Sequence, residues 1–133
     1  MTLAGAGAGL VRGDGGTSFH DYQVAAVRSA RAAHHALAAA ELTGEAVLAK
    51  RVTPPYAETR LSDSRTELGG AAARLAGVGP PDERCERMRD ELRPLLARAN
   101  VVLAVLESAV TEQNVADIEP VAEALDAFAR AHR

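Results

Sequence analysis

The chain has 133 residues, of which 47 % are hydrophobic and only 3 % aromatic, and its formal net charge is −3. This length is typical of one domain with a single hydrophobic core. A core built mainly from Leu, Val and Ala favours closely packed helices over β-sheets. The net negative charge argues against a nucleic-acid partner, which needs a clustered basic surface. No apolar run approaches the roughly 20 residues of a membrane-spanning helix.

Residues 1–17 are dominated by Gly and Ala and include Gly13-Asp14-Gly15-Gly16, which predicts a flexible tail. Within it, Leu3-Ala4-Gly5 matches the first three residues of a bacterial lipobox, although Ala6 stands where the lipidated cysteine would be. The segment therefore resembles a lipoprotein start, or the trailing end of a signal sequence, that lacks the essential cysteine. Chance is the alternative, because such a tripeptide arises easily in a Gly/Ala-rich segment.

The first helix is expected to begin near Thr17 or Ser18, whose hydroxyl groups can cap free amides, and to run to about Arg51. Thr43-Gly44 leaves open an early end followed by a short separate turn, but we expect one continuous helix. Its packing positions follow steps of three and four residues: Phe19, Ala26, Ala30, Ala33, Leu37, Ala40 and Val47.

Two proline pairs mark the next corners, Pro54-Pro55 before the second helix and Pro80-Pro81 before the third. The packing positions of the second helix are Ala57, Leu61, Ser64, Leu68, Ala71, Leu75 and Val78. Those of the third helix are Cys85, Met88, Leu92, Leu95, Ala99, Val102, Leu106 and Ala109. Leu96, Leu103 and Val110 widen this last stripe, so we expect the third helix to be the most buried.

The last corner is expected at Asn114 to Asp117, with Asp117 as the cap of a short fourth helix. Ile118, Val121, Leu125 and Phe128 form the packing seam of that helix, which ends beside His132. Because short corners make successive helices antiparallel, residues 18–133 are predicted to form one all-α domain, an up-down-up-down four-helix bundle. A short fourth helix would leave an apolar strip uncovered, formed by Met88, Leu92, Leu95 and Leu96. A second copy of the chain, or the first helix swung across, would cover it.

Ligand patterns for metals and haem are missing, since the sequence has no Glu-x-x-His pair and Cys85 is its only cysteine. The adjacent His34 and His35 point about 100° apart on a helix, so one ion cannot take both. Counting from the corners places this pair level with about Glu91 and His132 level with about Ala99, roughly 12 to 15 Å apart. We therefore expect no metal site and no cofactor. His34 or His35 should face solvent, and His132 should fray with the terminus.

Catalytic patterns are also missing, because no serine lies in an activating motif and the carboxylates follow the pattern of a solvated helix face. We predict no catalytic residue and no enzyme. Gly69-Gly70 lies inside the second helix, where each glycine costs roughly 1 kcal/mol relative to Ala. This cost predicts a close approach of the first helix, or a small ligand, at that level. Asn100, a polar residue beside the third seam, either fixes register or lines a pocket.

The chain resembles small extracytoplasmic, lipoprotein-like helical-bundle proteins of GC-rich bacteria, which are mostly of unknown function. The features that carry this resemblance are an Ala-rich first helix, a Leu/Val-rich third helix and the corners Pro54-Pro55-Tyr56 and Pro80-Pro81-Asp82. The resemblance covers residues 18–132 and implies an extracytoplasmic or cell-surface location, but it carries no functional residue.

Two functions stay open. The first is a non-catalytic interaction or structural module, tethered through its N-terminus, that binds a protein partner or itself. The second is a bundle that binds a small ligand or a metal near Gly69-Gly70. A filled core with an exposed apolar strip favours the first, and a cleft with converging polar groups favours the second.

Overall fold

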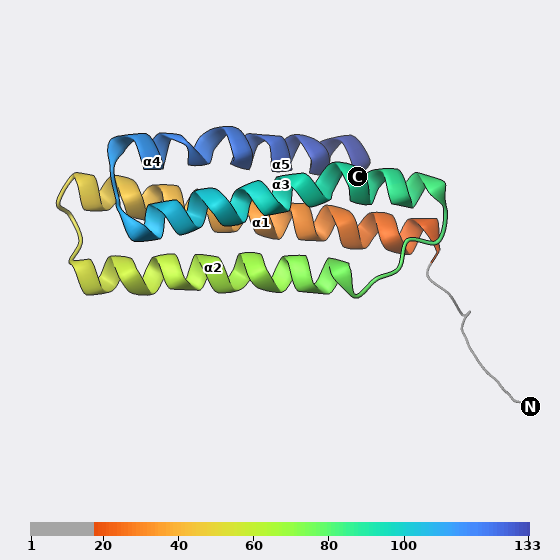
Figure 1. Cartoon of the computed structure of the whole chain (residues 1–133), viewed down its shortest axis with the longest axis horizontal. Coiled ribbons are helices and arrows are strands. Elements are labelled where there is room, and N and C mark those ends of the chain that lie inside the picture. The colour runs from red at the N-terminus through yellow and green to blue at the C-terminus, as the bar shows by residue number, and fades with distance from the viewer. Residues whose placement is uncertain (1–17) are drawn as a thin grey trace, which may run out of the picture.

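A computed structural model describes residues 18–133 (Figure 1). Its helices are α1 (Phe19–Leu48), α2 (Pro54–Ala76), α3 (Glu83–Ser108), α4 (Glu112–Ala116) and α5 (Ile118–His132). The first three helices alternate in direction, and α4 and α5 together form the fourth leg (Figure 1). The predicted all-α, up-down-up-down bundle is therefore confirmed, with no strand in the described range. The predicted tail and the lipobox-like tripeptide lie in residues 1–17, outside the described residues.

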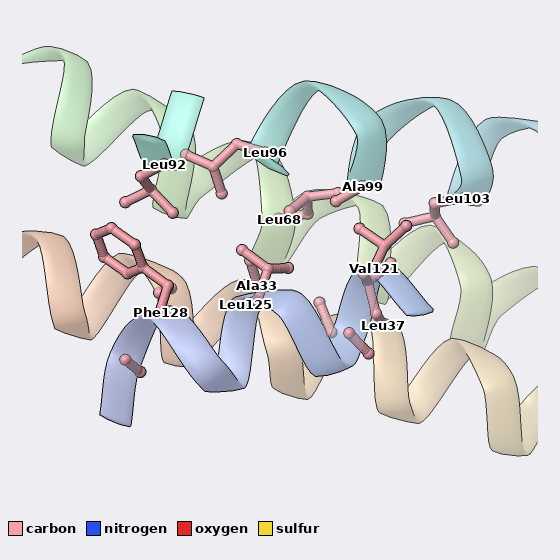
Figure 2. Close-up of a cluster of buried hydrophobic side chains, with 14 of the residues drawn as sticks. Ala33, Leu37, Leu68, Leu92, Leu96, Ala99, Leu103, Val121, Leu125 and Phe128 are labelled. Atoms are coloured by element: carbon pink, nitrogen blue, oxygen red, sulfur yellow. The ribbon is translucent and has the colours of Figure 1, made fainter. Parts of the chain in front are cut away.

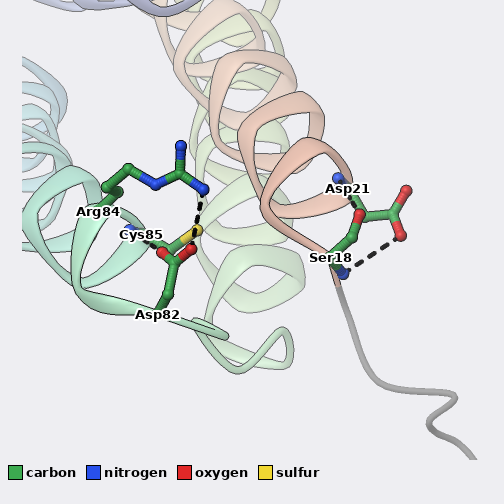
Figure 3. Close-up of polar contacts among 5 residues, drawn as sticks. All are labelled: Ser18, Asp21, Asp82, Arg84 and Cys85. Carbon is green, nitrogen blue, oxygen red and sulfur yellow. Dashed lines mark hydrogen bonds and ion pairs between the residues drawn. The ribbon is translucent and has the colours of Figure 1, made fainter.

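The start of α1 is fixed by Ser18. Its Oγ accepts a hydrogen bond from the Asp21 amide at 3.1 Å, and the Asp21 carboxylate accepts one from the Ser18 amide at 3.4 Å (Figure 3). These reciprocal bonds satisfy amides that have no partner inside the helix. The helix then passes through Thr43-Gly44 without a break, so the continuous helix is confirmed and the early end is excluded.

The end of α1 is a tight reversal built around Lys50. The Lys50 amide donates to the carbonyl of Val47 at 3.0 Å, and the Arg51 amide donates to that of Ala46 at 2.8 Å. This pair of bonds is a Schellman motif, which requires a left-handed residue and usually takes glycine there. Lys50 has a φ of 59°, the only positive φ of a residue other than glycine in the described range. The bundle therefore holds a lysine in a conformation that its Cβ disfavours.

The α1 helix lies at the centre of the bundle. Its backbone approaches those of α2, α3, α4 and α5, whereas the backbones of α2 and α5 stay apart on opposite sides of the core. Fully buried alanines of α1 let α3 approach it diagonally across the core, because each presents only a methyl group. These alanines are Ala26, Ala30, Ala33, Ala36 and Ala40. The expectation that the third helix would be the most buried is wrong, since α1 has ten buried residues and α3 has seven.

Larger side chains close the core around these alanines. Leu92 and Leu96 of α3 face Leu125 and Phe128 of α5, with Leu68 entering from α2 (Figure 2). The predicted seams of the second and fourth helices are buried, apart from the partly buried Val78 at the end of the second. On α3 the fully packed row is Leu92, Leu96, Ala99, Leu103 and Leu106. Leu95 and Val102 are only partly buried, because they lie beside this row.

The last corner lies earlier than predicted. α3 ends at Ser108, and Thr111 caps α4 by accepting a hydrogen bond from the Asn114 amide at 3.1 Å. Asp117 occupies the N-cap position of α5 but does not cap it as predicted, because its backbone is helical, with φ −69° and ψ −14°, and its side chain makes no cap hydrogen bond. Pro120 cannot donate to the carbonyl four residues earlier, which separates α4 from α5 without turning the chain.

The shifted corner closes the end of the bundle that was expected to be open. Only 4 % of Met88, none of Leu92 and 6 % of Leu96 is exposed. The fourth leg begins at Glu112 and not after a corner at Asp117. The end of α5 therefore lies closer to the start of α3 than predicted. The predicted uncovered strip is therefore wrong, and it offers no surface to a second copy of the chain.

Candidate functional site

His34 and His35 do not act together. The Nδ1 atom of His34 lies 2.9 Å from the carbonyl oxygen of Ala122, which joins α1 to α5, while His35 is exposed. Their ring centroids are 5.6 Å apart and the rings are tilted by 54°. His35 therefore faces solvent as expected of one of the pair, and His34 makes a contact between helices.

His132 does not fray. It is the last residue of α5, its Nε2 lies 3.1 Å from Oε1 of Glu91, and its ring packs against Phe128. The side-chain amide of Gln23 also donates to its main-chain oxygen. The prediction that His132 lies level with Ala99 is wrong, because the last corner lies earlier than predicted. When the corner between two antiparallel helices moves by one residue along the chain, the residue that faces a given position changes by two. Within residues 18–133, no group of three or more His, Cys, Asp or Glu is placed to hold a metal ion.

Gly69-Gly70 makes no close helix contact. A Cβ on Gly69 would meet nothing within 4 Å, and one on Gly70 would meet only the tip of Arg74, at 3.3 Å. The prediction that the first helix approaches closely at this level is therefore wrong. The close approach occurs instead at Gly44, where a Cβ would lie 2.6 Å from Cγ2 of Val115.

Cys85 belongs to a structural junction. The Asp82 carboxylate accepts a hydrogen bond from the Cys85 amide at 3.0 Å and forms an ion pair with Arg84 at 3.1 Å (Figure 3). Arg84 in turn lies 3.8 Å above the centre of the Phe19 ring, which ties the start of α3 to the start of α1. Burial, followed by the neighbouring Asp82, raises the pKa of the Cys85 thiol. This thiol stays protonated and is a poor nucleophile.

The outer face of α3 is apolar over its second half. Val101 is 62 % exposed and Val105 is 43 % exposed. A groove of about 380 Å³ lies beside Val101 and is also lined by Arg98, one turn earlier on α3, and by Pro120 of α5. We call the exposed residues at these helical steps the outer α3 face: Pro94, Ala97, Val101, Ala104, Val105 and Ser108. Residues 99–106 carry no charge. The half of this stretch that faces solvent is therefore as uncharged as the half that packs in the core. Sequence analysis left these residues off the packing stripe of the third helix but assigned them no role.

A second groove, also of about 380 Å³, lies between the end of α2, the corner after it and α3. Its walls are mostly apolar, and Arg89, Arg93 and Asn100 supply polar groups. Tyr22 of α1 forms part of the wall and is only 1 % exposed. We call this the Tyr22 groove. Asn100 is exposed and lines it, which decides between the two roles predicted for that residue.

Tyr22 was missed by sequence analysis, although a signal for it exists. The predicted stripe of the first helix goes from Phe19 to Ala26 and treats Gln23 as a break. A step of three residues from Phe19 instead reaches Tyr22, a large side chain that fills the gap. The Gln23 side chain then bonds across to α5 rather than entering the core.

None of the described helices has the length and apolar content needed to cross a bilayer. The chain matches no known family model, no curated protein and no solved structure. The outer α3 face and the Tyr22 groove are therefore the two surfaces of the described residues from which we infer a function.

Proposed function

We propose that the chain is a non-catalytic helical interaction module and that the outer α3 face pairs it with a second copy of itself. The observation that carries this proposal is the exposure of Val101 and Val105 in the middle of an uncharged helical stretch. Burial of apolar surface contributes about 25 cal/mol per Å², so two such faces gain by meeting.

The shape of the face fits a helix of the same kind. Ala97 and Ala104 lie one turn before and one turn after Val101, and small side chains let two helix axes approach closely. A two-fold axis through Val101 would place Ala97 of each copy against Val105 of the other. One helix face is smaller than a standard interface, so we expect a weak dimer, with a dissociation constant on the order of micromolar.

Attachment at a cell surface belongs to the same proposal. It is supported by the resemblance of Leu3-Ala4-Gly5 to the start of a lipobox and of the helical chain to small extracytoplasmic bundles. Tethering would concentrate copies of the chain on one surface, where even a weak contact between them is populated.

Sedimentation equilibrium over a range from micromolar to several hundred micromolar tests the pairing. The wild-type chain should dimerise, and Val101→Glu should stay monomeric because it buries a charge at the centre of the interface. Leu42→Glu is the matched control: Leu42 is 67 % exposed and lies on α1, outside the outer α3 face. It should dimerise like the wild type.

A wild-type chain that remains monomeric throughout this range contradicts the proposal. Equal weakening of the dimer by Val101→Glu and Leu42→Glu also contradicts it, because the contact would then not be specific to α3. Circular dichroism of both variants checks that each keeps the helical fold.

A further inference from the structure

We propose that the Tyr22 groove binds a medium-chain monocarboxylate, with the carboxylate held by Tyr22 and Arg93 and the apolar chain lying along α2. This site is separate from the pairing of α3 faces, since the groove and the outer α3 face share only Ala97. The inference goes beyond the interaction module and does not depend on it.

The first observation is a buried hydroxyl without a partner. Tyr22 is 1 % exposed, yet within residues 18–133 its hydroxyl makes no hydrogen bond. A buried donor left unsatisfied is unfavourable, so native proteins nearly always provide a partner for it. Tyr22 forms part of the groove wall, and the charges that act on its hydroxyl include Arg89 and Arg93, which line the same groove, so a ligand bound there could supply such a partner.

The charges around this hydroxyl select an anion. Arg89 and Arg93 both line the groove, and Arg89 is occupied by Asp90, with 3.2 Å between its Nη2 and the carboxylate. Arg93 makes no ion pair among the described residues and remains available to a ligand. Arginine presents parallel N–H donors that match the two oxygens of a carboxylate.

The protonation state of Tyr22 fits the role of a donor. Burial raises the pKa of its hydroxyl, and Cys85 and Asp90 add to that effect, whereas Arg89 and Arg93 oppose it. The phenol is therefore neutral at pH 7 and donates its proton in a hydrogen bond. A phenol donor and a guanidinium together recognise a carboxylate and discriminate against a cation.

The walls explain why the ligand has an apolar tail. Leu75, Val78 and Leu96 also line the groove, with Leu75 and Val78 on the side of α2 and the corner after it and both arginines on α3, and its volume of about 380 Å³ exceeds that of a small inorganic anion. Grooves of this size with a few polar groups are typical of sites for small organic ligands. A chain of about eight carbons places its carboxylate at the polar side and its methylene groups against these walls.

Tyrosine fluorescence gives a direct test with octanoate as the probe. The chain has two tyrosines and no tryptophan, so the Tyr56→Phe variant leaves Tyr22 as the only fluorophore. Tyr56 is 53 % exposed, and its replacement should not disturb the fold. We expect octanoate to quench Tyr22 emission saturably. Octanol, which has the same chain without the charge, should bind at least about tenfold more weakly.

Three variants locate the carboxylate. Arg93→Gln should weaken octanoate binding at least about tenfold, whereas Arg60→Gln, an exposed arginine of α2 outside the groove, should leave it unchanged. Tyr22→Phe, followed by calorimetric titration, should weaken binding about fivefold. It should not lower the melting temperature of the ligand-free chain, because it removes an unsatisfied hydroxyl.

Several results would overturn the site. They are equal affinity for octanoate and octanol, no saturable quenching at millimolar octanoate, or an Arg93→Gln variant that binds as tightly as the wild type. A Tyr22→Phe variant that melts several degrees lower and binds octanoate normally would show that the hydroxyl serves the core instead. Repeating the titration in Val101→Glu separates the two proposals, since octanoate should bind this monomeric variant with unchanged affinity.

Discussion

Gly44 of α1 packs so closely against Val115 of α4 that a Cβ on the glycine would lie 2.6 Å from Cγ2 of the valine. The valine is only 6 % exposed and β-branched, so it cannot easily turn away. We expect Gly44→Ala to destabilise the chain by about 1 to 2 kcal/mol, because overpacking outweighs the gain in helix propensity. Urea denaturation measures this free energy.

Gly69→Ala is the matched control for that change. The same substitution in open space on α2 should stabilise the chain by about 0.5 to 1 kcal/mol through helix propensity alone. The double variant Gly44→Ala with Val115→Ala should be more stable than the sum of the single effects, since one methyl then fills the space left by the other. Stabilisation by Gly44→Ala equal to that by Gly69→Ala would mean that the helices are not in close contact there.

Leu103 tests the core on α3. It is 1 % exposed, and Leu103→Ala should cost about 2 to 5 kcal/mol through lost burial and a residual cavity. Leu42→Ala makes the same change at a position that is 67 % exposed and should cost less than about 0.5 kcal/mol. Thermal and urea denaturation at low protein concentration measure both. Similar losses at the two positions would show that the packing of α3 is assigned wrongly.

Lys50→Gly should stabilise the chain by about 0.5 to 1 kcal/mol. Lys50 occupies the left-handed position of the Schellman motif, where a Cβ is disfavoured and glycine is not. The gain is limited because glycine also makes the unfolded chain more flexible. Lys50→Ala removes the charge but keeps the Cβ, so its melting temperature should match the wild type. If Lys50→Ala stabilises as much as Lys50→Gly, charge rather than backbone conformation is responsible.

Glu41 predicts a dependence of stability on pH. Burial raises the pKa of its carboxyl, and nearby Glu45, Glu119 and Glu123 raise it further. The folded state therefore holds this proton more tightly than the unfolded state, and the ionised group destabilises the fold at neutral pH. As the pH falls through the raised pKa, protonation removes this destabilisation, and the removal is complete below the unfolded value of about 4.3.

Glu41→Gln should accordingly raise the melting temperature at pH 7, and the difference from the wild type should shrink toward pH 3. Glu67→Gln, an exposed residue of α2 outside this cluster, serves as the control and should change the melting temperature little at either pH. A Glu41→Gln variant that is less stable than the wild type at pH 7 would mean that the carboxylate makes a favourable contact.

The bundle was predictable because its signals are local. Ser18 caps α1, the prolines at 54–55 and 80–81 stop helices, and residues three and four apart repeat along each seam. The last corner was less predictable, because both Asp117 and Thr111 are of residue types that cap helices, and Asp is the more preferred of the two. A difference of a few residues there moved the facing level of His132 from Ala99 to Glu91.

The candidate sites depended on contacts that periodicity does not encode. Within residues 99–106, the period placed Ala99, Leu103 and Leu106 inside and left Val101 and Val105 outside, as the structure has them. It did not indicate that the exposed apolar side chains could form a binding surface. The two glycine sites were likewise indistinguishable by composition, yet Gly44 meets Val115 and Gly69 meets open space. Among the residues of the Tyr22 groove, only Asn100 was considered in advance as a residue that lines a pocket.

Disulfide cross-linking at the proposed two-fold axis tests the central claim most directly. Cys85 is fully buried, so in a Val101→Cys variant the introduced thiol is the accessible one, and the wild-type chain controls for Cys85 itself. With oxidised glutathione, Val101→Cys should form a covalent dimer at least about tenfold faster than Leu42→Cys, because pairing brings the two thiols together beforehand. Equal rates of dimer formation for Val101→Cys and Leu42→Cys would contradict pairing through the outer α3 face.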